Sequence, residues 1–220
     1  MKRIKFLTSI LTIGLCASVA HADHHLVSSL KRGESGMKSA GPLAFGPEGI
    51  LFVGDSAGAA VFAFATGDFG KRESAAAYKI TGIDGKIAAA IGTVPENIII
   101  NDLAVNPISG NAYVSMSRGR GSKSAPAIVK VTPEGVVNLI RHDGLKFARA
   151  ALPNAPKDEM VGEGRRRSNP RQSSITDIGY VDGKVLVAGL SNEEFSSNLR
   201  SIPFPFKKVD NGVGVEIYHG

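Results

Sequence analysis

The stretch "INDLAVNPISGNAYVS", residues 100–115, alternates apolar with other residues, passes through a segment rich in Asn, Pro and Gly, and then becomes apolar again. Alternation with a period of two is typical of a β-strand, because successive side chains of a strand point to opposite faces. A turn with Gly or Asn between two such runs is typical of an antiparallel hairpin. The stretch therefore predicts two short strands joined by a tight turn.

The same pattern occurs twice more, as "SAGPLAFGPEGILFVG" in residues 39–54 and as "ITDIGYVDGKVLVAG" in residues 175–189. Further apolar runs follow the copies and predict third strands at residues 59–66, 126–133 and 199–206 and fourth strands at residues 76–82 and 135–141. A repeated unit of three or four antiparallel strands is typical of a propeller blade. The sequence therefore predicts an all-β fold, a whole or partial β-propeller with about three to four blades in this chain.

The copies are spaced more widely than common propeller repeats of about 40 to 50 residues. Leu103 lies 60 residues after Leu43, and Ile178 lies 75 residues after Leu103. The extra residues are assigned to long loops, in which residues 86–91 and 145–154 each predict a helical turn or two. A β-sandwich, which also contains short alternating strands, is the alternative fold. It gives no reason for the pattern to recur.

Residues 1–22 have a basic start, an apolar run over residues 6–19, and the small-residue sequence Ala20-His21-Ala22. This arrangement is typical of a secretory signal peptide, and the apolar run is shorter than the roughly 20 residues that span a bilayer. The sequence predicts a secreted or periplasmic protein with no membrane span after signal removal, and a β-propeller domain over residues 23–220. Because the one cysteine, Cys16, lies in the removed segment, no disulfide is expected.

Charge and composition argue against a nucleic-acid partner. Removing residues 1–22, which hold three basic residues and no acidic one, lowers the formal charge from +6 to +3. The chain has no Trp and only 6% aromatic residues, so it offers few rings on which bases could stack. Positive charge is concentrated in residues 161–174, where Arg165, Arg166 and Arg167 predict a site for a phosphate or an acidic polysaccharide. A solvated loop is the alternative interpretation.

The sequence "GPLAFGPEGILFVGDSAGAAVFAFATGD", residues 41–68, resembles a blade of secreted bacterial propellers of the NHL and senescence-marker-protein (gluconolactonase-like) type. In these blades a strand begins beside a Gly-Pro or Asn-Asp pair, turns through Pro-x-Gly, and continues as a strand that ends in an acidic residue, here Asp55. The resemblance implies a propeller. Known propellers have about four to eight blades, so three clear blades do not close a ring. The chain is therefore expected to be an N-terminal portion of a longer propeller, incomplete at its C-terminus, or to close by self-association.

The first strand of a blade lines the central channel, so Asn101-Asp102 and Asp177, at matching positions, are expected at one rim. Their carboxylate and amide oxygens suit Ca²⁺. In the gluconolactonase-like type a similar Asn-Asp pair and a further acid hold a metal that polarises a lactone carbonyl. The resemblance therefore implies Asn101, Asp102 and Asp177 as ligands of Ca²⁺, although Ala40 stands where that type has an early Glu. The alternative is that both aspartates cap backbone amides.

Asp55, and Asn192 and Glu193 in the polar loop 190–200, are further candidates for contacts with a ligand. Each is equally suited to a turn. His142-Asp143-Gly144 predicts a turn, and no histidine spacing of a metal or triad motif is present. The sequence favours a secreted β-propeller that binds a small molecule, glycan or protein partner on its loop face. A calcium-dependent hydrolase of the lactonase type is the alternative, so enzymatic activity is left open, with no catalytic residue predicted and no cofactor beyond Ca²⁺.

Overall fold

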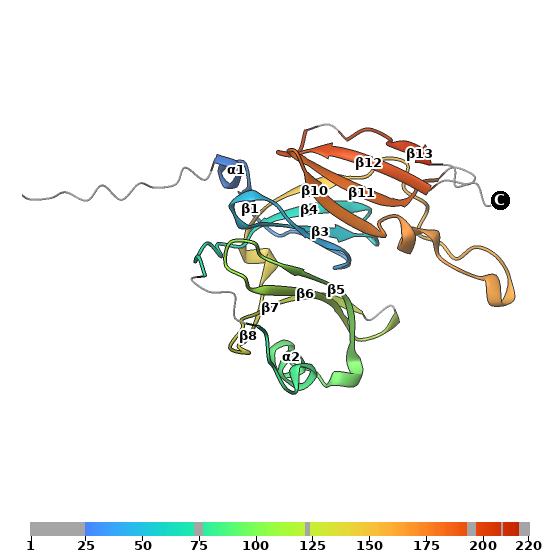
Figure 1. Cartoon of the computed structure of the whole chain (residues 1–220). Coiled ribbons are helices and arrows are strands. Elements are labelled where there is room, and N and C mark those ends of the chain that lie inside the picture. The colour runs from blue at the N-terminus through green and yellow to red at the C-terminus, as the bar shows by residue number, and fades with distance from the viewer. Residues whose placement is uncertain (1–24, 73–76, 122–123, 193–196, 208, 216–220) are drawn as a thin grey trace, which may run out of the picture.

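The computed structural model of the chain describes residues 25–72, 77–121, 124–192, 197–207 and 209–215. These residues form three antiparallel sheets, one around each copy of the repeated pattern (Figure 1). Strand residues outnumber helical residues, 40% against 16%. The prediction of an all-β fold is therefore confirmed. The predicted signal peptide lies outside the described residues.

Each sheet is named by its place in the sequence. The first sheet has the order β1 (Lys31–Arg32), β9 (Lys146–Ala151), β4 (Ala60–Ala65), β3 (Ile50–Asp55) and β2 (Leu43–Phe45). The second sheet runs β5 (Ile98–Val105), β6 (Ala112–Arg118), β7 (Ala125–Val131) and β8 (Val137–Leu139). The third sheet runs β10 (Asp177–Val181), β11 (Lys184–Leu190), β12 (Ser197–Pro203) and β13 (Val213–Val215).

Short helical elements connect and cover the sheets. The α-helices are α1 (His25–Ser28) and α2 (Ile83–Ile91). The 3-10 turns are η1 (Pro47–Gly49), η2 (Pro95–Asn97), η4 (His142–Gly144), η5 (Gly164–Arg166) and η6 (Pro170–Ser173). No helix in the described ranges has the length and apolar character needed to cross a bilayer.

The three predicted hairpins are confirmed, and their turn residues explain them. Asp182 and Gly183 both have positive φ, 47° and 75°, as a two-residue turn between β10 and β11 requires. In the turn between β5 and β6, the Asn106 carboxamide oxygen accepts from the Ile108 amide at 2.9 Å, and Gly110 has φ 71°. These local hydrogen bonds set the strand register, and so decide which side chains face the core.

The sheets stack face to face in the order third, first, second, with α2 against the far face of the second sheet (Figure 1). Phe52 and Val187 belong to the core between the first and third sheets, and Phe62 and Tyr113 to the core between the first and second. The first sheet is thus covered on both faces, and every residue of β3 is buried. Such a strand reads as a continuous apolar run.

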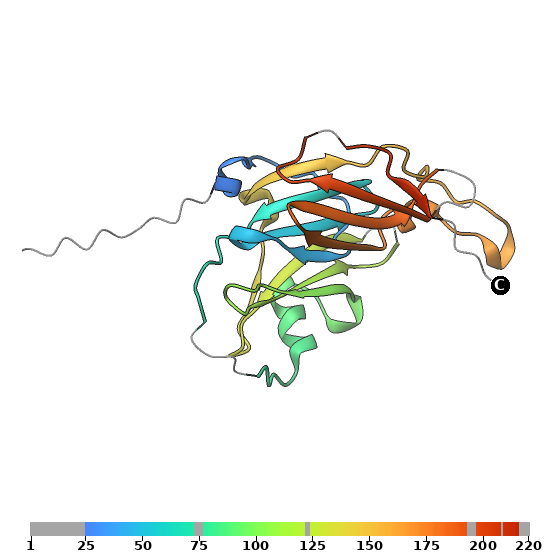
Figure 2. The ribbon, with the colours of Figure 1, turned by 45° about the horizontal axis from the view of Figure 1, so that its top comes forward.

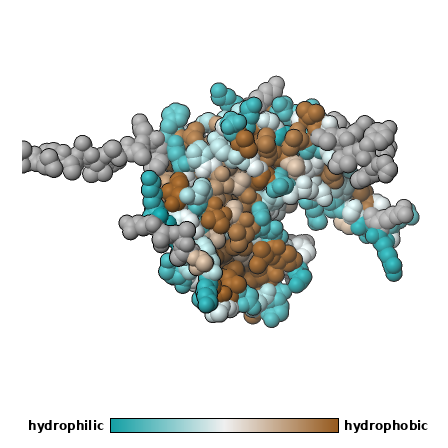
Figure 3. Space-filling model, in the orientation of Figure 1, coloured by the Kyte–Doolittle hydropathy of each residue, from teal (hydrophilic) through white to brown (hydrophobic). Residues whose placement is uncertain are grey.

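The strands that begin the three copies of the repeat, β2, β5 and β10, are here called the first strands, and they are neighbours because β2 contacts both β5 and β10. Figure 2 shows the three sheets from a second direction. β5 is an edge strand of its sheet, and Ile100, Leu103 and Val105 on it are 59%, 55% and 50% exposed. Figure 3 shows apolar side chains gathered over the part of the surface where the second sheet lies. The chain therefore has three stacked sheets with adjacent first strands, whereas a β-sandwich has two sheets.

One strand lies where the sequence predicted a helical turn. Residues 146–151 of the segment 145–154 form β9, which lies beside β4 in the first sheet, between β4 and the two-residue edge strand β1. The sequence had assigned that position to residues 76–82, whose described part, 77–82, contains no strand. The ring of Phe147 packs beside those of Phe62 and Phe64, which stabilises the pairing. The predicted fourth strand at 135–141 (β8) and the helical turn at 86–91 (α2) are confirmed.

Candidate functional site

Asn101 and Asp102 lie at a β-bulge of β5 and join the second sheet to the first. The Asn101 carboxamide donates to the carbonyl oxygen of Ala40 at 2.7 Å. Asp102 accepts from the Leu43 amide at 2.7 Å through Oδ2 and from the Leu103 amide at 2.7 Å through Oδ1. The structure therefore places the middle of β5 beside the start of β2, whereas the repeat had placed Asn101 and Asp102 at the start of their strand.

Asp177 begins β10 and is exposed, and its Oδ1 accepts from the Ile178 amide at 2.8 Å. The hydrogen bonds of Asp102 and Asp177 are those expected of aspartates that cap backbone amides. No group of three or more His, Cys, Asp or Glu side chains placed to hold a metal occurs among the described residues. The calcium assignment of Asn101, Asp102 and Asp177 stays a prediction.

Asp55 is buried at the end of β3, with 1% of its surface exposed. Its carboxylate accepts from the backbone amides of Lys38, Ser39 and Gly58 at 2.8 to 2.9 Å and from the Ser39 hydroxyl at 2.7 Å. A buried carboxylate is stable only when its oxygens are paired in this way. These contacts join the segment before β2 to the turn between β3 and β4, and Asp55 has little contact with solvent.

The remaining residues predicted to contact a ligand are Asn192 and Glu193, which follow β11, and the arginines 165–167, which precede β10 in the sequence. Asn192 is exposed, and its amide donates to the Asn154 carbonyl oxygen at 2.8 Å, whereas Glu193 lies outside the described residues. Arg165 and Arg167 are exposed, in and beside η5, which also contains Arg166. Their assignment to a phosphate or polysaccharide stays a prediction.

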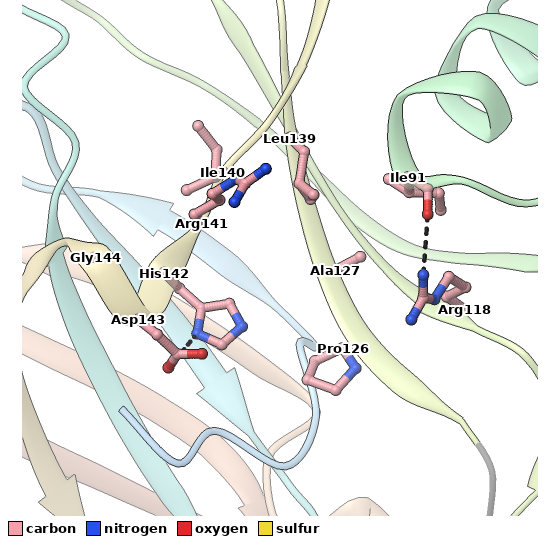
Figure 4. A pocket seen from close by; sticks show the side chains of 10 residues that line it. All are labelled: Ile91, Arg118, Pro126, Ala127, Leu139, Ile140, Arg141, His142, Asp143 and Gly144. Carbon is pink, nitrogen blue, oxygen red and sulfur yellow. Dashed lines mark hydrogen bonds and ion pairs between the residues drawn. The ribbon is translucent and has the colours of Figure 1, made fainter. Parts of the chain in front are cut away.

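A cavity of about 490 Å³ lies at the outer side of the second sheet, away from the predicted residues (Figure 4). Apolar side chains from three elements form its walls, namely Ile91 at the end of α2, Pro126 and Ala127 on β7, and Leu139 on β8. The segment 140–144, which leads from β8 through η4, closes it with polar side chains. The cavity volume is within the range of about 300 to 1,000 Å³ that small-molecule sites occupy.

Three polar side chains meet at one side of this cavity. Ser35 Oγ lies 2.8 Å from His142 Nδ1 and donates to Asp143 Oδ1 at 2.8 Å. His142 Nδ1 and Asp143 Oδ1 are 3.1 Å apart, and the Ser35 amide also donates to Asp143 Oδ1 at 3.1 Å. Ser35 is buried, with 7% of its surface exposed, so it holds the side chains of His142 and Asp143 from the protein interior.

These contacts determine the hydrogen position on the neutral His142 ring. The Ser35 hydroxyl hydrogen is directed at Asp143, so Ser35 Oγ presents a lone pair to Nδ1, and Asp143 Oδ1 can only accept. Nδ1 therefore carries the hydrogen, and Nε2 of the neutral ring is an acceptor. Figure 4 shows this second nitrogen directed toward the wall formed by Pro126, into the cavity.

Asp143 holds its negative charge at neutral pH. The hydrogen bond from the Ser35 hydroxyl lowers the pKa of Asp143, burial opposes it, and the Ser35 amide and His142 add to the lowering, so that the pKa lies below its ordinary value. The arrangement is not that of a serine nucleophile with its base, because Ser35 and Asp143 both contact the same ring nitrogen. Ser35 and Asp143 instead orient the His142 ring so that Nε2 can accept a hydrogen bond.

Two arginines also line the cavity. Arg118, at the end of β6, donates from Nη1 to the Ile91 carbonyl oxygen at 3.1 Å, which places its guanidinium at the last turn of α2. Arg141 precedes His142 and is exposed. The carbonyl end of a helix favours a nearby cation, so the Arg118 position is electrostatically favourable.

Sequence reasoning interpreted His142-Asp143-Gly144 as a turn, which η4 confirms, but missed the site that this turn helps to build. Ser35 and His142 are 107 residues apart, so no local spacing connects them. The local signal was the run Arg141-His142-Asp143, three charged or titratable residues directly after a predicted strand.

Comparison of the chain with models of protein families, with curated proteins and with solved structures gives no match. The resemblance to NHL and gluconolactonase-like propellers therefore stays a prediction, and the function has to be argued from the site.

Proposed function

We propose that this protein is an exported small-molecule-binding protein and that the cavity beside β8 and η4 is its binding site. The observation that carries the proposal is the His142 ring, which Ser35 and Asp143 hold with Nε2 facing a cavity of about 490 Å³. A side chain fixed in this way offers one directed hydrogen-bond acceptor at an open cavity with both apolar and polar walls. That combination is typical of ligand sites.

The residues that line the cavity indicate the class of ligand. Ile91, Ala127 and Leu139 contribute apolar surface that would cover the body of a compact molecule. His142 Nε2 would accept from a hydroxyl or N–H group of that molecule. Because the imidazole is already oriented, binding would cost little side-chain entropy.

We propose further that the three sheets are consecutive blades of a propeller. Three features support this: a shared strand pattern, first strands that are neighbours, and face-to-face packing of the sheets. The exposed apolar residues of β5 suit a strand that would line a channel. The signal-like sequence of residues 1–22 supports export.

The cavity is tested by blocking it. Leu139→Trp adds a large side chain at the wall, and Val136→Trp places the same side chain before β8, at a residue outside the cavity lining that is 53% exposed. Nuclear magnetic resonance titration with a library of compact alcohols, amides and acids is run on the parent chain and both variants. We expect binders to shift the His142 ring signals, and to lose affinity for Leu139→Trp by about tenfold or more while Val136→Trp binds normally.

A library that yields no binder at the cavity would refute the proposal. So would binders whose affinity is the same for Leu139→Trp and the parent, because their site would lie elsewhere. Thermal unfolding of both variants confirms that any loss of affinity is not a loss of folding.

A further inference from the structure

We infer that the ligand of this cavity carries an anionic oxygen group, a carboxylate or phosphate on a compact apolar body, which Arg118 and Arg141 recognise. The inference rests on the proposed function, and it adds the charge of the ligand. It depends on where the positive charges of the cavity lie and on what already neutralises them.

Arg118 has unused hydrogen-bonding capacity. Its guanidinium has five N–H donors in a planar fork, of which one is used on the Ile91 carbonyl oxygen within the part of the chain that the structure describes. That bond fixes the side chain at the wall without neutralising it, since a carbonyl has no net charge. A fork held in this way matches the two oxygens of a carboxylate or phosphate.

Arg141 forms no ion pair with any described residue. Within the described ranges, Lys130 forms an ion pair with Asp68, and the His142–Asp143 contact is an ion pair only when His142 is protonated. Neither includes an arginine of the cavity. The charges of Arg118 and Arg141 are therefore both available to a ligand.

Among the described residues, Asp143 is the one acidic residue that lines the cavity, and one of its two carboxylate oxygens is bonded to Ser35. Its Oδ1 receives hydrogen bonds from Ser35 and faces His142 Nδ1, whereas His142 Nε2 faces the cavity (Figure 4). Two guanidinium charges against one carboxylate leave the described lining of the cavity net positive. Both arginines are exposed, so their attraction to an anion acts through solvent and should weaken as salt is added.

The test compares benzoate with benzamide, which has nearly the same shape and no charge, and adds phenyl phosphate as a second anion. Affinities for each probe are measured by nuclear magnetic resonance titration of the parent chain, Arg118→Gln and Arg141→Gln. The matched control is Arg165→Gln, an exposed arginine of the loop that the sequence had predicted to bind anions. Charge-assisted hydrogen bonds predict a loss of about tenfold in the affinity for benzoate in each cavity variant and little change in Arg165→Gln.

The results separate the charge of the ligand from the existence of the binding site. Benzamide binding as tightly as benzoate, with both blocked by Leu139→Trp, would overturn the inference and leave the proposed function standing. Loss of benzoate affinity in Arg165→Gln alone would move the anion site to the loop and overturn it too. If neither benzoate nor phenyl phosphate binds at about 10 mM, a concentration at which even weak sites fill, the anionic inference falls, while the proposed function is decided by the library titration.

Arg118→Lys separates recognition from folding. Lysine keeps the charge and can still donate to Ile91, but it lacks the fork. If the guanidinium binds an oxyanion, this variant keeps the parent melting temperature and recovers only part of the affinity for benzoate. Full recovery by lysine would show that charge alone acts, and would still support an anionic ligand.

Discussion

Asp68 and Asp143 are both carboxylates that accept hydrogen bonds from a serine hydroxyl, but the Asp68 side chain is 9% exposed and that of Asp143 is 59% exposed. Asp68 follows β4 and accepts from Ser109 at 2.8 Å and Tyr113 at 3.0 Å, so it ties the first sheet to the second. Asp143 lies at a cavity and orients a histidine. The difference teaches that burial, more than hydrogen-bond partners, separates a carboxylate that supports the fold from one that supports a site.

The largest expected effect is on stability. Asp68→Ala removes the acceptor of Ser109, Asn111 and Tyr113 and leaves the buried Tyr113 hydroxyl without that partner. We expect the free energy of unfolding to fall by about 3 kcal/mol, measured by urea denaturation. Asp143→Ala is the control and should cost less than about 1 kcal/mol, because its carboxylate is mostly solvated. Equal losses would contradict the comparison.

The Asp68 contribution should also depend on pH. Burial raises the pKa of Asp68, but hydrogen bonds from Asn111, Ser109 and Tyr113 and the charge of Lys130 together outweigh it, so the folded pKa lies below the ordinary 3.8. A lowered folded pKa means that the stabilisation is present above the unfolded pKa and is lost as the pH falls through the folded pKa.

Urea denaturation of the parent and Asp68→Asn between about pH 5 and pH 2 measures this, since unfolded aspartate titrates near pH 3.9. We expect the stability difference between the two proteins to narrow as the solution becomes more acidic. A difference that stays constant over this range would show that the charge of Asp68 contributes nothing.

The exposure of Asp102 is intermediate between that of Asp68 and that of Asp143. Asp102 is half-buried and accepts hydrogen bonds from two backbone amides. Asp102→Ala should lower the free energy of unfolding by about 1 to 2 kcal/mol through loss of these bonds. If capping is its whole role, the loss is the same with and without millimolar Ca²⁺. A rise in melting temperature with Ca²⁺ in the parent, absent from Asp102→Ala, would instead establish the predicted metal site.

The sequence predicted those parts of the fold that neighbouring residues determine. The hairpins β2–β3, β5–β6 and β10–β11 follow from alternation and from turn residues such as Asp182-Gly183. β9 was not predicted, because its partner β4 precedes it by a whole sheet and its burial alternates poorly. Pairing across such a distance is decided by packing of Phe147 on Phe62 and Phe64, which no local pattern encodes.

The candidate site was harder to predict for the same reason. The repeat correctly indicated that Asp102 and Leu43 lie close together, although Leu43 begins β2 and Asp102 lies inside β5. The cavity instead depends on Ser35, Arg118 and His142, which come from three unrelated parts of the chain. Their residue types are common on surfaces, and only the three-dimensional arrangement distinguishes them.

The smallest expected effect sharpens the comparison at the cavity. Asp143→Asn keeps an oxygen that can accept from Ser35 and His142 Nδ1, so folding stability should change by less than about 0.5 kcal/mol. It removes the one like charge near a bound anion, and we expect benzoate to bind about twofold more tightly at low salt. The gain should shrink in about 0.5 M salt, where such interactions are screened. Markedly weaker binding of benzoate by Asp143→Asn would show that the carboxylate charge is needed to hold His142, and that orientation of the ring outweighs the charge of the ligand.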